Sequence, residues 1–285
     1  PRNKSVFWAK VNYDGFVKSK GKRLTSSKAA DEFQEIKPFL IKSVKEENFK
    51  SNKAKYYVNK PIDFSDRQLE LIPEAYLDEG ITSVSETVTE ADKIVRELVS
   101  FSLMSKQIDN SFIKFSKSQK TNPFKTKSIK YKIFGLKDLF SYVNTGSFHV
   151  SGDLDAGTVP LISCKTIENG TEGYFDIQNH LFENCVTIAS DGSWPMSSFY
   201  HTYKFAAKDN VIVCRPNKNL NTKAILFITA QLNSQIWRFS YGRKCYLNKT
   251  DKIQIPLPIN EKGDIDFAMM DAIIDSCTVW DDLKS

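Results

Sequence analysis

The sequence predicts an α+β fold, in which a helical N-terminal connector precedes a mixed, mostly antiparallel β-rich domain with a C-terminal helix. Two β-branched runs, residues 186–189 and 211–214, are bounded by turn residues and predict buried strands. A third strand is predicted over residues 252–258, where isoleucine and leucine alternate with lysine, glutamine and proline. Apolar residues recur at helical spacing over residues 90–106 and 264–275, which predicts two amphipathic helices.

The N-terminal part begins with a predicted strand. Residues 6–11 alternate in character, and Asp14-Gly15-Phe16 supplies the turn after them. Residues 56–76 are punctuated by prolines and predict an extended connector that packs on a neighbour.

The helix over residues 90–106 has a clear apolar face. Ser85 or Thr89 would cap it. The apolar positions are Ile94, Val95, Leu98 and Phe101, and the charged positions are Glu90, Asp92, Lys93, Arg96 and Glu97. An exposed apolar face on this helix would indicate a subunit contact.

Residues 106–132 hold eight lysines and a single acidic residue, Asp109. This composition is typical of a solvated linker. It also suits an arm that touches DNA phosphates, with Lys125 and Lys127 as candidate contacts.

The β-rich domain is predicted to begin near residue 131, with a further strand over residues 159–163. Residues 222–239 have apolar positions near helical spacing, but their β-branched content leaves a strand possible. The helix over residues 264–275 places apolar side chains on one side, namely Ile265, Met269, Ala272 and Ile273. Gly170 and Gly173 are predicted to permit tight turns.

Composition fits a globular chain of 285 residues with one large or two modest domains, since 41% of the residues are hydrophobic and 26% charged. The five cysteines show no CxxC spacing, which favours reduced core thiols in a cytoplasmic protein over a zinc site or disulfides. No signal or membrane-spanning pattern is present. Pro1 stands where an initiator methionine is usual, which suggests a fragment or a processed chain.

The net charge of +6 is unevenly distributed. Residues 1–130 carry 25 basic and 17 acidic residues, and residues 131–285 carry 15 and 17. The basic excess therefore lies outside the β-rich domain, and attraction to a polyanion would be modest there.

Several ordered motifs point to a family. Residues 153–174 are DLDAGTVPLISCKTIENGTEGY, and VTIASDGS, FY and YGRKCYLNKTDKIQIPLP follow in order before GDID. This series resembles the target-recognition domain of the specificity subunits of Type I restriction-modification systems. It also resembles the equivalent domain of fused Type II restriction–methyltransferase enzymes. The resemblance covers residues 131–275 and favours a helix in residues 222–239, capped by Asn221 or Thr222.

A shorter resemblance concerns the N-terminus. FWAKVNYDGF, followed by GKR, is similar to the C-terminal tail of the catalytic subunit of N6-adenine DNA methyltransferases. It implies a helix over residues 31–40 that ends near Pro38, and a catalytic domain outside this chain. LIPEAYL at residues 71–77 resembles the segment that precedes the recognition domain in fused enzymes. We therefore expect a connector over residues 1–130 and a recognition domain over residues 131–285.

Catalytic motifs are not found in the sequence. An N6-adenine methyltransferase needs an Asn/Asp-Pro-Pro-aromatic loop for the flipped adenine, and Asn122-Pro123-Phe124 lacks the second proline. A metal-dependent nuclease would need clustered acids with a lysine, and Asp63, Asp66 and Glu70 lack such a partner strand. The histidines (His149, His180, His201) are isolated, which is typical of structural or contact residues. We expect no enzyme activity and no cofactor in this chain, with S-adenosylmethionine, and Mg²⁺ if cleavage occurs, in the catalytic part.

Sequence-specific binding to double-stranded DNA is the leading hypothesis, since arginine, lysine and asparagine suit base edges and hydroxyls suit phosphates. The candidate contacts are Lys165, Thr166, Asn169, Ser193, Ser197, Ser198, Tyr200, His201, Tyr203, Tyr241, Arg243 and Lys244, with Lys125 and Lys127 in the linker. The aromatic residues could instead be core side chains with a polar tip. Partners would be an N6-adenine methyltransferase and a nuclease, without a membrane. The alternatives are a subunit-docking module without base contact and a metal-dependent nuclease.

Overall fold

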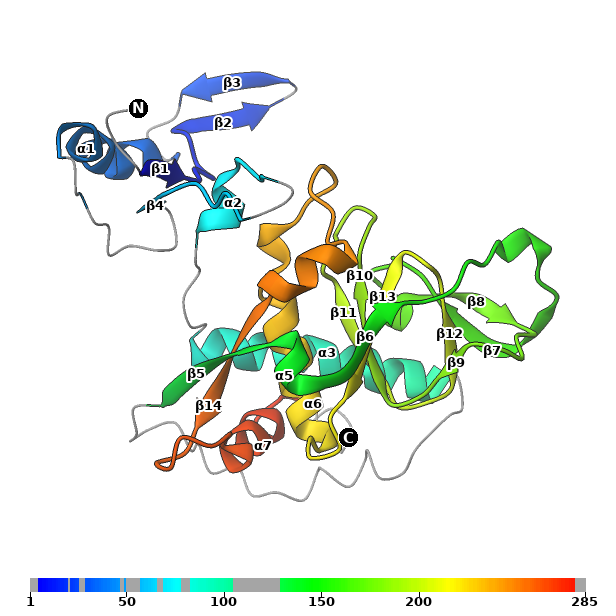
Figure 1. Ribbon diagram of the computed structural model, residues 1–285. Coiled ribbons are helices and arrows are strands. Elements are labelled where there is room, and N and C mark those ends of the chain that lie inside the picture. Colours follow the sequence, from blue (N-terminus) through cyan, green and yellow to red (C-terminus); the bar gives the residue numbers. More distant parts are fainter. Residues whose placement is uncertain are drawn as a thin grey trace. The chain divides into compact units, whose positions relative to one another are not determined.

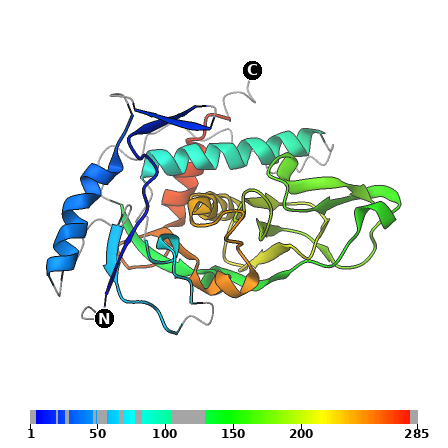
Figure 2. The ribbon, with the colours of Figure 1, turned by 90° about the horizontal axis from the view of Figure 1, so that it is seen from above.

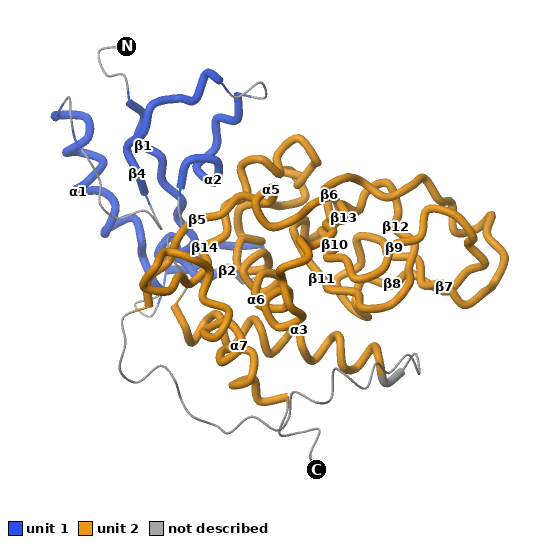
Figure 3. The backbone as a smooth tube through the Cα atoms, turned by 60° about the horizontal axis from the view of Figure 1, so that its bottom comes forward, with its two compact units in different colours: residues 1–80 blue, residues 81–285 orange. Residues whose placement is uncertain are grey.

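The computed structural model describes residues 5–19, 21–25, 29–46, 49, 57–65, 69–77, 83–104 and 129–279. It divides into two compact units, unit 1 with residues 1–80 and unit 2 with residues 81–285 (Figure 3). The sequence predicted a boundary at residue 130, whereas the compact units divide after residue 80. Residues 106–130 therefore fall within the range of unit 2. No helix in the described ranges is long and apolar enough to cross a bilayer.

Unit 1 is a small assembly of short elements. Its strands are β1 (Val6–Ala9), β2 (Phe16–Ser19), β3 (Lys22–Thr25) and β4 (Tyr57–Lys60), and its helices are α1 (Glu32–Lys45) and α2 (Pro73–Tyr76). β1 pairs antiparallel with β4, and β2 with β3. The Trp8 ring stacks on Tyr76 with centroids 3.9 Å apart, and its indole nitrogen donates to the Lys60 carbonyl over 3.1 Å.

Two predictions for unit 1 were wrong. α1 continues through Pro38 to Lys45. The proline removes one backbone hydrogen bond of the helix, but Ile36 in the same helix stays buried. Asp31 caps this helix by accepting from the Phe33 amide over 3.0 Å. Residues 73–76 form one helical turn, not an extended connector, since proline is favourable in the first helical position.

In the described part of unit 2 the strands form three sheets, and helices pack beside them (Figure 1). Its strands are β5 (Lys130–Gly135), β6 (Phe140–Thr145), β7 (Ala156–Ile162), β8 (Thr171–Phe175), β9 (Leu181–Phe182), β10 (Cys185–Ala189), β11 (Ser198–His201), β12 (Phe205–Ala207), β13 (Val211–Pro216) and β14 (Gln254–Ile259). Its α-helices are α3 (Val84–Met104), α5 (Leu136–Leu139), α6 (Thr222–Asn233) and α7 (Phe267–Asp275), and its 3₁₀ turns are η2 (Ser151–Asp153), η3 (Glu168–Gly170), η4 (Ile236–Arg238) and η5 (Leu247–Lys252).

The sheets are mostly antiparallel, and the α+β class is confirmed. One sheet has the order β11-β10-β13-β6, the second β8-β7-β12-β9, and β14 pairs with β5 alone. Among the named strands of the described ranges, β7 and β12 form the parallel pair. Among the described strands β14 pairs with β5 alone, apart from an isolated bridge between Ile259 and Ile265, so it is an edge strand, as its two prolines predicted.

α3 belongs to the core of unit 2. Its apolar residues Ile94, Val95 and Leu98 are buried, and the helix runs across α6 and α7 (Figures 1 and 2). The Gln231 amide donates to the Thr87 hydroxyl over 3.0 Å, which ties α6 to α3. The buried face explains why the units divide before this helix and not after it.

The start of α3 differs from the prediction. Ser83, not Ser85 or Thr89, caps the helix together with Glu86. The Ser83 amide donates to the Glu86 carboxylate over 3.0 Å, and the Glu86 amide donates to the Ser83 hydroxyl over 3.3 Å. This reciprocal arrangement is a capping box, which the Ser-x-x-Glu spacing encodes.

The family resemblance favoured a helix in residues 222–239, and α6 covers residues 222–233 of this range, with the 3₁₀ turn η4 after it. The Asn221 side chain caps it by accepting from the Ala224 amide over 2.7 Å. α7 buries Met270, Ile273 and Ile274, so of the predicted face only Ile273 is fully covered.

Candidate nucleic-acid interface

Three loops of unit 2 meet at one surface. The Cys245 amide donates to the Ser190 carbonyl over 2.9 Å, which joins the loop after α6 to the β10–β11 loop. A Cβ atom added at Gly192 would lie 3.3 Å from the Cβ of Cys164, so the loop after β7 also touches the β10–β11 loop. Figure 1 shows the β10–β11 loop beside the loop that follows α6. We call residues 163–168, 190–197 and 239–246 the three-loop surface.

The lysines at this surface are balanced by carboxylates. Lys244 forms an ion pair with Asp191 and also lies 4.2 Å from the centroid of the Tyr241 ring. Lys165 pairs with Glu168 at the tip of the loop after β7. Because each of these lysines is paired with a carboxylate, the pairs are nearly neutral from a distance and attract polyanions only weakly.

Arg243 is held by its own loop. Its guanidinium group donates to the Arg238 carbonyl and lies 4.9 Å from the centroid of the Phe239 ring. Stacking and a backbone hydrogen bond fix the direction of the side chain, which is half-buried. A guanidinium group held in this way is suited to a directional contact.

Six predicted contacts are brought together at the three-loop surface. Thr166, Ser193 and Tyr241 are exposed there, and Lys165, Arg243 and Lys244 are half-buried. The candidate contacts did not include the exposed Ile167, Tyr246 and Glu168, and Trp194, for which a core position was considered, is exposed. Their position directly beside turn residues, as in Asp-Gly-Ser-Trp, was the available signal.

The other six predicted contacts in unit 2 are interior residues. Asn169, Ser197, Ser198, Tyr200, His201 and Tyr203 are all buried, with Ser198 and His201 at 0% exposure. A side chain sealed in the core does not touch a duplex that lies on the surface. We therefore assign these six residues, including Ser197 at the buried end of the β10–β11 loop, to the frame beneath the exposed loop residues, which for the tyrosines is the core role considered as the alternative.

These interior residues form a hydrogen-bonded network. The His201 ring bonds to the Thr187 and Tyr203 hydroxyls, each over 2.8 Å, and Asn169 donates to Tyr203 over 2.7 Å. Burial lowers the pKa of His201 to about 3, so its ring is neutral near pH 7. Burial also raises the pKa of the Tyr203 hydroxyl far above its usual value. The network is structural, as expected for an isolated histidine.

The lysine-rich segment lies outside the described residues. Lys125 and Lys127 fall in this segment. Their contact with DNA phosphates stays a prediction.

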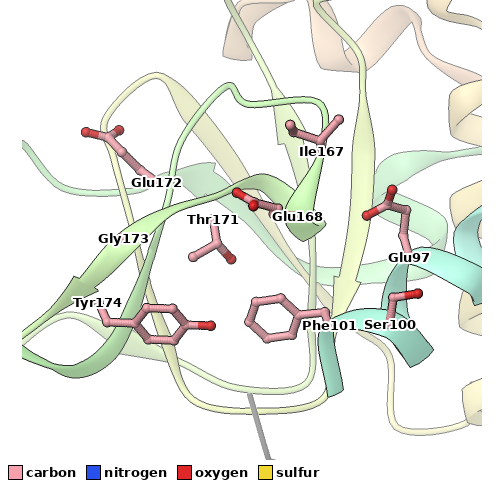
Figure 4. Close-up of a pocket in the computed structure, with 9 residues that line it drawn as sticks. All are labelled: Glu97, Ser100, Phe101, Ile167, Glu168, Thr171, Glu172, Gly173 and Tyr174. Atoms are coloured by element: carbon pink, nitrogen blue, oxygen red, sulfur yellow. The ribbon is translucent and has the colours of Figure 1, made fainter. Parts of the chain in front are cut away.

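A pocket of about 360 Å³ lies beside the tip of the loop after β7. Figure 4 shows the carboxylates of Glu97, Glu168 and Glu172 on one side and the rings of Phe101 and Tyr174 on the other. Glu168 is paired with Lys165 and Glu172 with Lys208, so the pocket offers no excess positive charge to bind the DNA backbone. Gly173, predicted as a turn residue, lies within β8, where an added Cβ would come within 3.0 Å of the Phe175 ring.

The cysteines and acidic residues do not form a metal site in the part of the chain that the structure describes. No cluster of three or more His, Cys, Asp or Glu side chains occurs in that part. The five cysteines are free thiols, and burial raises the pKa of Cys164 to about 11. A thiol with this pKa is protonated at neutral pH and is a poor nucleophile.

The same region of the chain matches a known family. Residues 128–279, more than half of the chain, match the Type I restriction modification DNA specificity domain. The chain belongs to this family. The match includes the three-loop surface and α7, and it begins after α3. The specificity domain thus contains all the candidate contacts outside the lysine-rich segment.

One curated relative is similar to about half of the chain at low sequence identity. The specificity subunit S.BcgI of a Type II restriction enzyme from Heyndrickxia coagulans is 25% identical over 146 residues, which cover 51% of this chain and 42% of the relative. The match therefore spans less than half of that relative's length.

Two solved structures are also similar. The S subunit of the Type I restriction-modification system from M. genitalium has a TM-score of 0.42 at 13% identity and matches 99% of this chain and 77% of its own. The HsdS subunit from Thermoanaerobacter tengcongensis has a TM-score of 0.38 at 12% identity and matches 87% and 62%. Both scores are low.

Proposed function

We propose that the specificity domain binds double-stranded DNA at a particular sequence through the three-loop surface. The observation that carries the proposal is the convergence of three loops, distant in sequence, that bring predicted contacts onto one surface. Lys165 and Arg243 suit the acceptors of guanine, which are the commonest targets of basic side chains in the major groove. Thr166, Ser193 and Lys244 suit phosphate contacts that set the register of the protein on the duplex.

The biological role would be to direct N6-adenine methylation by a catalytic part outside this chain, with a nuclease as a further partner. The sequence contains no Asn/Asp-Pro-Pro-aromatic loop, so its residues do not fit the adenine site of such an enzyme. We therefore assign S-adenosylmethionine, and any Mg²⁺, to the catalytic part. A chain that recognises DNA but carries out no reaction is consistent with membership of a DNA specificity family.

A docking role is the second candidate, and a different surface favours it. The apolar face of α3 is buried, so residues 90–104 do not support docking. In unit 1, however, α1 exposes Phe33, Leu40 and Val44, the last at 72%. Replacement of Leu40 and Val44 by aspartate should abolish copurification with the methyltransferase part and leave DNA selection unchanged. Retained copurification would remove α1 from the contact.

Selection on a random duplex library tests the leading proposal. The full chain would be incubated with the library at near-physiological salt, and the retained DNA would be sequenced. The proposal expects one enriched short motif, because base contacts discriminate by about 1–3 kcal/mol for each position. Retention that depends on salt but enriches no motif would show that the chain alone does not read sequence.

A further inference from the structure

The loop after β7 ends in a rigid tip with a positive and a negative side chain together. Lys165 and Glu168 form an ion pair, and their side chains are 37% and 54% exposed. The other lysines nearby are more covered, with Lys208 at 20% and Lys244 at 18%. Lys165 and Glu168 are therefore the most accessible ion pair at the three-loop surface.

The tip is held in place from below. Glu168 and Asn169 both have φ in the left-handed region, at +54° and +53°, and Gly170 follows at +77°. The Asn169 side chain is buried and donates to the Tyr203 hydroxyl, while its backbone amide donates to Glu97 of α3 over 3.3 Å. The Ser163 amide closes the loop by donating to the Gly170 carbonyl over 2.9 Å. A loop fixed at its base presents its end groups in a defined arrangement.

A lysine and a glutamate in contact match one base pair of DNA. In the major groove, guanine presents the acceptors N7 and O6, and cytosine presents the N4 amino donor. Guanine O6 and cytosine N4 are joined by a Watson–Crick hydrogen bond and lie about 2.9 Å apart. A paired ammonium and carboxylate have the same close spacing and the complementary hydrogen-bonding character.

We infer that Lys165 and Glu168 together read one G·C base pair, with the ammonium group on guanine and the carboxylate on cytosine. This inference rests on the proposed function and names a base pair that the surface selects. The ion pair stays together on binding, so the carboxylate carries no unpaired charge toward the phosphates. An exposed pair of this kind is weak, and its hydrogen-bonding groups exchange water for bases at low cost.

A charge swap tests the inference in the full chain. Lys165→Glu combined with Glu168→Lys keeps the net charge and the ion pair but exchanges the two ends. Selection on random duplexes should return the wild-type motif with a G·C pair replaced by C·G at one position. The preference should change there by about 5-fold to 150-fold, and the other positions should remain.

The matched control exchanges another ion pair whose two residues are also three positions apart in the sequence. Lys93 and Glu90 lie 2.9 Å apart on α3, and Lys93→Glu with Glu90→Lys should leave the motif unchanged. If the swap at the tip impairs folding, Glu168→Gln removes the charge alone and should relax the preference at the same position by about 5-fold or more.

The outcomes separate the inference from the proposed function. If the wild-type chain enriches no motif, the proposed function fails and the inference fails with it. If the wild type enriches a motif that the swap and Glu168→Gln leave unchanged, the pair does not read a base and only the inference is overturned. A motif altered at many positions would also overturn it, since the tip would then act on the whole surface.

Discussion

The buried amide of Asn169 donates a hydrogen bond of 2.7 Å to the hydroxyl of Tyr203, 34 residues further along the chain. Tyr203 in turn bonds to His201, and its ring lies 4.6 Å from that of Phe101 on α3. One interior network therefore connects the tip of the loop after β7 with a strand and with α3. Asn169, His201 and Tyr203, which the sequence offered as DNA contacts, are buried beneath the three-loop surface.

Asn169→Ala should lower the free energy of unfolding. The change leaves buried partners unsatisfied, which costs about 1–3 kcal/mol. It also places alanine at a left-handed φ, which costs about 1–2 kcal/mol more. Denaturant unfolding monitored by tryptophan fluorescence would measure the loss. Asn169→Gly is the control, since glycine accepts the same φ. Equal losses for the two variants would show that backbone strain contributes nothing.

The stability of unit 2 should fall as the pH drops below 6.5. The folded state keeps His201 neutral with a pKa of about 3, whereas the unfolded chain takes up a proton near pH 6.5. The unfolded state therefore binds more protons, and acid favours it. His201→Gln should be less stable at neutral pH but should lose this slope between about pH 6.5 and 5, above the usual carboxyl range. An unchanged slope in chemical denaturation would assign it to other groups.

Leu98→Ala should destabilise unit 2 by about 2–5 kcal/mol, because it opens a cavity where α3 packs on the core. Ser100→Ala, at an exposed position of the same helix, should change stability by less than about 0.5 kcal/mol. Denaturant titrations of both variants provide the comparison. Similar small losses would mean that α3 is an appendage and that the predicted boundary at residue 130 is the correct one.

Arg243→Ala should weaken binding to the selected duplex by about 1–3 kcal/mol and leave the chain folded. The loss should be much smaller for duplexes altered at the base that Arg243 contacts. Equilibrium titration by fluorescence anisotropy measures both, with Lys262→Ala in the turn between β14 and α7 as the control. If the preferred motif does not change, Arg243 contacts no base.

Replacing Lys125 and Lys127 by alanine should weaken binding to every duplex alike. Removing one lysine from a phosphate should reduce the salt slope of the binding constant by about 1. Titrations at several salt concentrations, with selected and scrambled duplexes, would show this reduction. A slope equal to that of the wild type would make the segment a linker that does not touch DNA.

The elements that sequence reasoning recovered are those with a strong local signal. β10 and β13 were predicted from their runs of β-branched residues. In the structure residues 186–189 and 211–214 are buried, as such continuous apolar runs indicate. β11 was missed, although its residues are all buried, because serine, tyrosine and histidine resemble a surface loop. Its polar groups have distant partners: the Ser198 amide donates to Asn233 over 2.7 Å, and His201 bonds to Thr187. Such partners are invisible without the fold.

The site shows the same division between local and distant information. The apolar face of α3 was correctly placed, but the helices that cover it lie more than a hundred residues later in the chain. The sequence placed the candidate contacts in three loops that do lie together, but it did not separate their side chains into exposed and buried. Lys244, for example, pairs with Asp191 across 53 positions, which composition and spacing do not reveal.

Hydrogen–deuterium exchange of the full chain on its selected duplex tests the central claim most directly. Exchange would be compared with that on a scrambled duplex of the same composition. Recognition by the three-loop surface predicts slower exchange at residues 163–168, 190–197 and 239–246 on the selected duplex only. Equal protection of these loops by both duplexes, or sequence-dependent protection confined to other segments, would contradict it.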